Sequence, residues 1–229
     1  MSLFAIGDLH MSNKSNKPMD VFGENWMNHK EKIFEDWKRK VCISDTVLIA
    51  GDTSWAMNME EARYDLDEIN NLPGKKIIIK GNHDYWWASI KKLNNMYENM
   101  YFIQNNYFSY EDYAICGSRG WICPNNNKFD DKDEKIYLRE IIRIENSIKE
   151  AKKEGFEKFI IMTHYPPTND NFDESKFIKL YKDYNVKKVV YGHLHGKESF
   201  SCGINGNIDG IEYHLVSCDY LDFKLKKIL

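Results

Sequence analysis

Residues 3–10 of this chain read LFAIGDLH: a short apolar run followed by polar residues. The same arrangement recurs at 46–52 (TVLIAGD), 76–84 (KIIIKGNHD), 159–164 (FIIMTH) and 187–195 (KKVVYGHLH). Each run has the length and the β-branched or aromatic content of a buried strand. Longer charged stretches with helical periodicity separate the runs, so the sequence predicts an α/β fold.

The remaining pattern completes this outline. Strands are expected at residues 3–6, 46–50, 76–79, 113–116, 159–162, 188–191 and 212–217, and helices at 26–41, 59–71, 86–96, 133–154 and 173–184. Residues 199–229, which three glycines interrupt, predict antiparallel hairpins without a helix. No repeat or Pro/Ser-rich linker divides the chain, so we expect one domain over residues 1–229.

Composition limits the class of protein. The hydrophobic fraction of 42% suits a globular domain, and the net charge of -3 argues against a nucleic-acid partner. The five cysteines form no C-x-x-C pair, and the first strand begins too early for a signal peptide. No apolar run approaches about 18 residues, so no membrane segment is expected. These features predict a cytoplasmic protein.

Seven of the residues that follow these strands offer an oxygen or imidazole nitrogen, and none offers a thiolate. In α/β sheets, residues beyond the carboxyl ends of neighbouring strands converge on one site. The i, i+2 spacing in DLH and HLH also directs both polar side chains to the same side of an extended segment. We therefore expect one site containing Asp8, His10, Asp52, Asn82, His164, His193 and His195.

Such a donor set suits two divalent cations about 3.5–4 Å apart, bridged by a carboxylate. Mn²⁺ or Fe is the first expectation for these ions, with Zn²⁺ as the alternative, because oxygen and imidazole ligands alone do not distinguish among them. Another interpretation is that the Asp and Asn residues end turns and the histidines fill the core. Turn preference alone does not select four ligand histidines and the adjacent His83 at these places, and the metal site is the stronger hypothesis.

His83 remains outside this ligand set, although it adjoins Asn82. A histidine in that position could donate a proton to a leaving oxygen or stabilise charge as imidazolium. Asp84 is the adjacent candidate for orienting His83, so both are predicted catalytic residues. The neighbouring Trp86 and Trp87 either stack on a substrate or pack in the core.

The series D-x-H, G-D, G-N-H-D, H and G-H-x-H, which spans residues 8–195, resembles the calcineurin-like metallophosphoesterase superfamily. The resemblance implies a four-layer α/β/β/α sandwich of two mixed β-sheets flanked by helices. It also implies that a metal-bound hydroxide attacks phosphorus and that His83 faces the phosphate. By the same resemblance, one metal is held by Asp8, His10 and His195, the other by Asn82, His164 and His193, and Asp52 bridges them.

One motif departs from the best-known branch of that superfamily. Protein serine/threonine phosphatases carry G-D-x-V-D-R-G, whereas this chain reads GDTSWAM at residues 51–57. Trp55 replaces the aspartate that orients the catalytic histidine, and Ala56 replaces a phosphate-binding arginine. This branch is therefore disfavoured.

Two further features bear on the substrate. Arg119 lies in a glycine-flanked turn after an expected strand, where it either binds a substrate phosphate or is an exposed loop arginine. Residues 17–26 form either a rim over the site or an ordinary surface connection.

The sequence as a whole predicts a metal-dependent phosphoric ester hydrolase. We expect two divalent metal ions as cofactors and a phosphate monoester or diester of a small molecule, such as a nucleotide, as substrate. A nuclease is the first alternative, and the acidic net charge disfavours it. The second is a non-catalytic metal-binding scaffold, in which ligand losses would be expected, yet all seven ligands are present.

Overall fold

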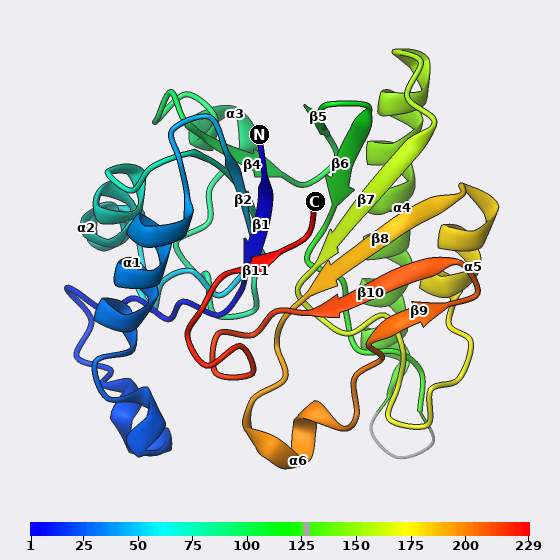
Figure 1. The fold of residues 1–229 in the computed structure, drawn as a ribbon. Helices are drawn as coiled ribbons and strands as arrows, with labels where there is room; N and C mark the ends of the chain where they lie inside the picture. Colours follow the sequence, from blue (N-terminus) through cyan, green and yellow to red (C-terminus); the bar gives the residue numbers. More distant parts are fainter. Residues whose placement is uncertain (126–128) are drawn as a thin grey trace.

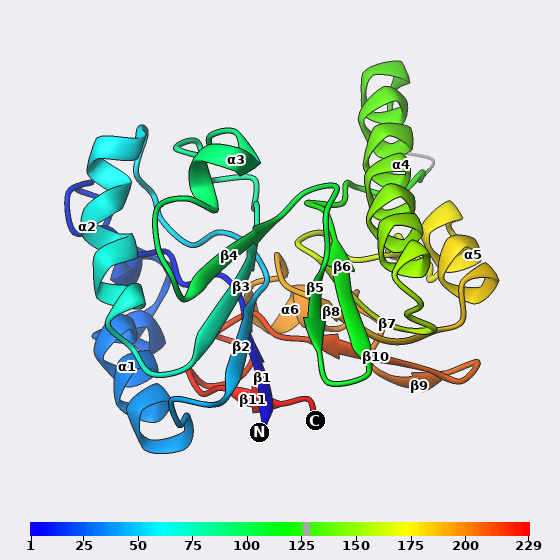
Figure 2. The ribbon, with the colours of Figure 1, turned by 90° about the horizontal axis from the view of Figure 1, so that it is seen from above.

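The computed structural model describes residues 1–125 and 129–229. Two β-sheets pack face to face, and helices cover the outer face of each sheet (Figure 1). Seen from above, the order of layers is helices, sheet, sheet, helices (Figure 2). The predicted four-layer α/β/β/α sandwich is therefore confirmed.

The first sheet has the strand order β11-β1-β2-β3-β4. Strands β1 to β4 run parallel to one another, and the short edge strand β11 pairs antiparallel with β1. The strands are β1 (Leu3–Ile6), β2 (Thr46–Ile49), β3 (Lys75–Ile79), β4 (Met100–Ile103) and β11 (Lys226–Lys227).

The second sheet has the strand order β5-β6-β7-β8-β10-β9. Strands β6, β7, β8 and β10 run parallel, whereas β5 and β9 pair antiparallel at the two edges. The strands are β5 (Phe108–Tyr110), β6 (Tyr113–Gly117), β7 (Lys158–Thr163), β8 (Val186–Tyr191), β9 (Gly206–Ile208) and β10 (Ile211–Leu215).

Helices α1, α2 and α3 cover the first sheet, and α4 and α5 cover the second (Figure 2). The long α4 begins at a capping box in which Asp130 and Asp133 accept from backbone amides at the helix start. The helices are η1 (Met19–Phe22), η2 (Glu24–Trp26), α1 (His29–Lys40), α2 (Met59–Asn70), α3 (Ile90–Leu93), α4 (Asp131–Lys153), α5 (Lys176–Asp183) and α6 (Gly196–Phe200).

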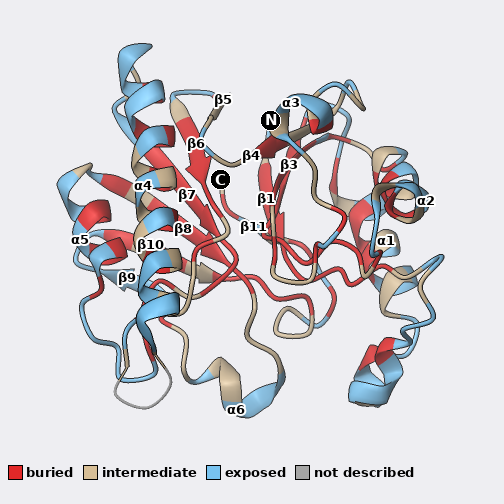
Figure 3. Ribbon diagram, turned by 180° about the vertical axis from the view of Figure 1, so that it is seen from behind, coloured by how far each residue is buried: buried red, intermediate tan, exposed pale blue. Residues whose placement is uncertain are grey.

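Three apolar cores separate the four layers. Along β1, Leu3 and Ala5 face the other sheet, while Phe4 and Ile6 face the helices, because successive side chains of a strand alternate. Both faces of the central strands are thus buried, and Figure 3 shows the strands as buried and the outer helix faces as exposed. This explains why the strand sequences are continuous apolar runs.

Several sequence expectations need correction. The helix expected at 86–96 is reduced to Ile90–Leu93, and residues 86–87 precede it as part of the core around α3. In the last third, α6 is a short helix, and β10 pairs parallel with β8. Of the antiparallel hairpins expected in residues 199–229, the structure contains the pair β9–β10. The last strand, β11, pairs with β1 of the first sheet instead. Strands β4 and β5 were not expected, and β9 and β11 lie within the expected hairpin region without predicted bounds of their own.

The described helices include none that is both long and apolar enough to cross a membrane. This agrees with the lack of a long apolar run in the sequence.

Candidate metal centre

The parallel strands of both sheets direct their carboxyl ends to the same edge of the sandwich, and the predicted ligands meet there. The first sheet contributes four of them and the second sheet three. They are Asp8 and His10 after β1, Asp52 after β2, Asn82 after β3, His164 after β7, and His193 and His195 after β8.

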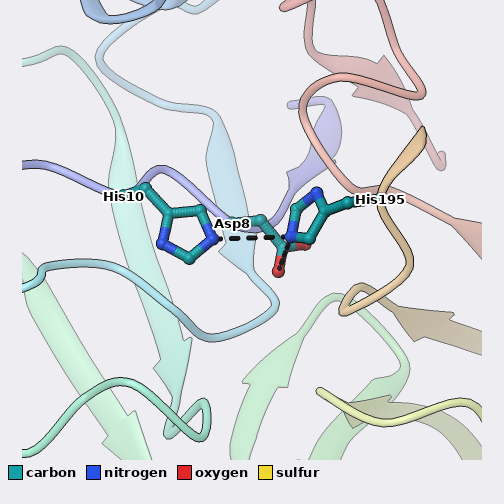
Figure 4. A group of neighbouring side chains, drawn as sticks. All are labelled: Asp8, His10 and His195. Atoms are coloured by element: carbon teal, nitrogen blue, oxygen red, sulfur yellow. Dashed lines mark hydrogen bonds and ion pairs between the residues drawn. The ribbon is translucent and has the colours of Figure 1, made fainter. Parts of the chain in front are cut away.

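Asp8, His10 and His195 form the first group, with ligand atoms within 4.8 Å of one another (Figure 4). Nε2 of His195 lies 3.4 Å from Oδ1 of Asp8 and 3.4 Å from Nε2 of His10. Imidazole lone pairs and a carboxylate oxygen that face each other at this distance need a proton or a cation between them. The donor types suit a divalent cation with oxygen and nitrogen ligands.

Asp52 lies between this group and a second one. Asp8, Asp52 and His164 also bring their ligand atoms within 4.8 Å of one another. Oδ2 of Asp52 is 3.8 Å from Nε2 of His10 and 3.5 Å from Nε2 of His164. Its other oxygen, Oδ1, accepts from the amide of His83 at 2.8 Å, which fixes the direction of Oδ2. One carboxylate oxygen is therefore shared between the two halves of the site.

His164 is the centre of the second half. Its Nε2 lies 2.7 Å from Oδ1 of Asn82 and 3.2 Å from Nδ1 of His193. Its Nδ1 lies 3.0 Å from the carbonyl oxygen of Ala50, an acceptor that holds the ring proton on Nδ1. The Nε2 lone pair is thereby directed toward the site, as a metal ligand requires.

Asp219 gives His195 the same type of support, and the sequence analysis did not identify it. Its Oδ1 lies 2.9 Å from Nδ1 of His195, and its Oδ2 accepts from the amide of Gly196 at 3.0 Å. A carboxylate on the outer nitrogen of a ligand histidine fixes the tautomer and orientation of the ring. The available signal was position: Asp219 follows β10, as the other motifs follow their strands.

The electrostatics indicate that, apart from His195, the ligand cluster holds little positive charge. Asp8 and Asp52 are both buried, and burial together with the charge of Asp8 raises the pKa of Asp52 to about 8. Burial lowers the pKa of His193 to about 3 and that of His10 well below its usual value, so both imidazoles are neutral. Neutral imidazoles can bind a divalent cation directly, and Asp52 would release its proton on binding one.

His195 differs from the other histidines. Burial opposes its charged form, but the carboxylates of Asp8 and Asp219 outweigh that effect and raise its pKa to about 10. A cation bound between Asp8 and His195 would take the place of this proton. The residues present therefore fit a pair of divalent cations.

The backbone around the ligands is strained. Asp8, His10, Asp52 and His193 all have left-handed φ angles, of 60°, 45°, 50° and 72°. For residues other than glycine this conformation costs roughly 1–2 kcal/mol each. Such strain is concentrated at functional sites, where the surrounding structure enforces it.

Two predicted glycines leave room for the carboxylates. A Cβ atom at Gly81 would lie 2.0 Å from Oδ1 of Asp52, and one at Gly192 would lie 2.3 Å from Oδ2 of Asp8. Any side chain at either position would displace a ligand. The glycines are thus required by close approach.

His83 lies beside this cluster, and Trp55 packs against it. The ring centroids of Trp55 and His83 are 4.2 Å apart, and Trp55 also stacks on His10 at 4.8 Å. Trp55 therefore contacts the face of His83 and positions it by packing. Burial lowers the pKa of His83, which favours the neutral ring in the metal-free site.

The position of Asp84 next to His83 suggests that it orients the His83 ring, but its carboxylate makes other contacts. Its fully buried carboxylate accepts from the amides of Thr53 at 2.9 Å and Gly81 at 2.7 Å, and from Nε1 of Trp86 at 3.0 Å. Within the part of the chain that the structure describes, the Asp84 carboxylate forms no hydrogen bond or ion pair with the His83 ring. These bonds tie the loop after β2 to the loop after β3 and favour a positioning role, and direct catalysis by Asp84 stays a prediction.

A cavity of about 740 Å³ adjoins the ligand cluster. His10, Asp52, His83, His193 and His195 contribute its polar lining. Its apolar lining is mostly aromatic, from Met19, Phe22, Trp26, Trp55, Phe200 and Phe223. A cleft with convergent polar groups and an apolar wall is typical of a small-molecule site.

Residues 17–26 form part of the wall of this cavity. Met19 and Trp26 are buried, and Nε1 of Trp55 lies 3.2 Å from Sδ of Met19. Nζ of Lys17 lies 4.4 Å above the Trp55 ring. Of the two interpretations of this segment, the rim agrees with these contacts.

Arg119 does not line this cavity. Its side chain stacks on Trp121 at 4.4 Å and lines a separate recess, although its backbone carbonyl accepts from the amide of His164 at 2.9 Å. Its predicted role in binding a substrate phosphate stays a prediction. Nε2 of His29 donates to the carbonyl oxygen of Leu9, 3.1 Å away, as a structural histidine would.

Two mixed sheets flanked by helices, with carboxylates and imidazoles gathered beyond the strand ends, define the metallo-dependent phosphatase class. The family model for calcineurin-like phosphoesterases matches residues 1–197, and the chain belongs to this family.

Other comparisons add information on the fold alone. A crystal structure of a protein of unknown function from Aquifex aeolicus is similar, with a TM-score of 0.55 and 17% sequence identity. The match covers 99% of this chain and 95% of that one. No curated protein sequence matches the chain.

Proposed function

We propose that this protein hydrolyses a phosphate ester of a small organic molecule with the help of two divalent cations. One observation carries the proposal. Two groups of ligand atoms share Asp8, Oδ2 of Asp52 in the second group also lies 3.8 Å from Nε2 of His10 in the first, and the cluster adjoins a cavity of about 740 Å³. In the calcineurin-like phosphoesterase family, which this chain joins, such an arrangement serves phosphoester chemistry.

In this proposal each half of the cluster holds one cation, and Asp52 contributes to both. The first would be held by Asp8, His10 and His195, and the second by Asn82, His164 and His193. Mn²⁺ or Fe is the first choice, with Zn²⁺ as the alternative. When bound, such cations lower the pKa of a coordinated water and neutralise phosphoryl oxygens.

His83 is the proposed proton donor to the leaving oxygen. Its Nδ1 is buried and has no hydrogen-bond partner among the described residues, so proton transfer to a substrate would take place at Nε2. Trp55 holds the ring in place at 4.2 Å, and the amide of His83 is anchored on Asp52. The donor is thus fixed relative to the shared metal ligand.

The cavity wall favours a compact organic phosphoester over a nucleic acid. Trp26, Trp55 and Phe223 can stack on a base or another planar group. Among the cavity-lining residues, Lys197 is the only lysine or arginine, and Asp219 and Asp222 are acidic. A groove that tracks a polynucleotide backbone carries several cations. The nuclease is therefore the less favoured alternative.

Metal dependence is the first test. Protein stripped with a chelator should be inactive toward aryl phosphates and aryl phosphodiesters, and adding Mn²⁺ should restore turnover. The same assay with nucleotides, phosphopeptides and oligonucleotides tests the substrate class. Full activity of the stripped protein would contradict the two-metal proposal, and a preference for oligonucleotides would support the nuclease.

Two variants test the separate roles. Asp52→Asn should lower metal content at both positions, since one carboxylate serves both. His83→Asn should retain both metals and lose most turnover, with the larger loss for substrates that have poor leaving groups. Two retained ions in Asp52→Asn would contradict the shared ligand, and unchanged turnover in His83→Asn would contradict the proton donor.

A further inference from the structure

A second recess lies outside the candidate metal centre, at the carboxyl ends of β3, β4 and β6. It has a volume of about 380 Å³ and shares no lining residue with the larger cavity. Three segments of the first sheet's side, one loop of the second sheet and helix α4 meet around it. Its lining residues include Lys80, Trp87, Gln104, Arg119, Arg139 and Arg143.

The recess contains four cationic side chains with little compensation. Arg139 and Arg143 lie four residues apart on one face of α4, where like charges repel. One buried carboxylate, Glu140, lies 2.6 Å from Arg143 and 3.7 Å from Arg139. Within the described residues, Lys80 and Arg119 form no ion pair. The chain as a whole has a net charge of -3, so this positive excess is local.

Two buried donors at the recess lack an acceptor. Nε of Arg119 and Nε1 of Trp87 are both inaccessible to solvent and have no hydrogen-bond partner in the described part of the chain. A buried donor that is left unpaired destabilises the fold, because its lost hydrogen bond to water is not replaced. An anion would relieve the repulsion and supply acceptors.

The chemistry of the lining selects the kind of anion. Arginine presents a planar fork of donors that matches phosphate and carboxylate oxygens in a bidentate manner. Three arginines and a lysine around one recess suit a multiply charged oxyanion better than a single carboxylate. The volume of about 380 Å³ lies at the lower end of the range, about 300–1,000 Å³, of small-molecule pockets.

We propose that this recess is a second anion-binding site that takes a phosphate group, either free or carried by a small molecule. It is linked to the candidate metal centre through the chain. The carbonyl of Arg119 accepts from the amides of His164 at 2.9 Å and Tyr165 at 3.2 Å. Lys80 directly precedes Gly81 and Asn82. A phosphate held by Lys80 and Arg119 would therefore contact the segment that carries Asn82 and a residue that is hydrogen-bonded to the segment that carries His164.

Equilibrium dialysis of the full-length protein with radiolabelled inorganic phosphate tests the site without any turnover. The Mn²⁺-loaded protein should bind phosphate at the centre and at the recess, and chelator-treated protein should retain the recess site. Arg119→Gln and Lys80→Gln should each weaken that retained site about tenfold or more, because each removes a charge-assisted partner. Arg119→Lys should keep part of the affinity and controls for folding.

Arg63→Gln is the matched control, because Arg63 is exposed on α2, a helix that does not line the recess. Arg143 is left unchanged, because its loss would leave the buried Glu140 without its closest partner. The proposal would be overturned if Arg63→Gln and Arg119→Gln changed phosphate binding by the chelator-treated protein to the same extent. So would chelator-treated wild-type protein that binds no phosphate at low salt.

A kinetic comparison distinguishes the two sources of the phosphate. If the recess holds a second phosphate of the substrate, Arg119→Gln should lower the ratio of kcat/KM for a bisphosphate over a monophosphate about tenfold. If it binds a separate phosphate compound, that ratio stays at the wild-type value while phosphate binding is still lost. Because the dialysis needs no activity, failure of the proposed hydrolysis would leave this site standing, and the reverse also holds.

Discussion

Replacing Asp219 by Asn should weaken metal binding without changing any predicted ligand. In the wild type, Oδ1 of Asp219 lies 2.9 Å from Nδ1 of His195, and Oδ2 accepts from the amide of Gly196 at 3.0 Å. An amide has one oxygen, so the variant can satisfy one of these two donors and must leave the other. The His195 ring then loses either its fixed tautomer or its adjoining turn.

The magnitude follows from outer partners of ligand histidines in general. Their removal costs about 10- to 100-fold in metal affinity, or about 1.4–2.8 kcal/mol. Titration calorimetry of the chelator-treated protein with Mn²⁺ should show this loss at one site, the one that contains His195. The other site should change less, since His164 is held by the Ala50 carbonyl.

Asp222→Asn provides the matched control. Asp222 also lines the large cavity and loses the same charge on substitution, but its carboxylate is exposed and pairs with Lys224. It should bind Mn²⁺ like the wild type. If Asp219→Asn also binds like the wild type, or if both variants weaken equally, the loss cannot come from orienting His195, and our account of Asp219 is refuted.

Three further predictions concern other parts of the molecule. Gly81→Ala should lose metal and at least about 100-fold in kcat, because its Cβ would lie 2.0 Å from Oδ1 of Asp52; normal metal content by elemental analysis would contradict this. Trp55→Leu should lower kcat about 2- to 12-fold and retain the metal content. The reason is that an aromatic contact of about 0.5–1.5 kcal/mol would no longer hold the His83 ring. An unchanged kcat would show that packing against Trp55 does not position this ring. Burial lowers the pKa of His214 to about 4 from the ordinary 6.5, so neutral His214 contributes to the free energy of unfolding above pH 6.5, and this contribution is lost as the pH falls toward 4. In urea unfolding, His214→Gln should reduce the fall in unfolding free energy over this pH range by roughly 1–3 kcal/mol. An unchanged pH profile would contradict the prediction.

The sequence was sufficient for the central strands and for the place of the candidate site. Residues 3–6, 46–49 and 188–191 are buried on both faces, so they appear as uninterrupted apolar runs between polar turns. Edge strands lack this signal. β5 and β9 have three residues each, with exposed members, and form because a neighbouring strand offers a hydrogen-bonding edge.

Contacts between distant segments could not be read from the sequence. Asp219 reaches His195 only because β10 lies parallel to β8 in the second sheet, and a parallel pairing has no local signature. The Trp55 contact with His83 likewise depends on the packing of the loops after β2 and β3. Adjacency suggested Asp84 as the partner of His83, whereas its carboxylate is occupied by the amides of both loops.

The arrangement of ligands also explains why a strained site is compatible with a stable fold. Four predicted ligands come from the first sheet and three from the second, so cations bound among them would join the two sheets at the edge where the inner core ends. A ligand that binds only the folded state adds RT ln(1 + [L]/Kd) to its stability, about 2.7 kcal/mol at a hundred times Kd. That gain is of the same order as the cost of two left-handed residues. Two cations bound at this level would contribute about 5.4 kcal/mol, which offsets a large part of the roughly 4–8 kcal/mol that the four left-handed residues Asp8, His10, Asp52 and His193 cost together.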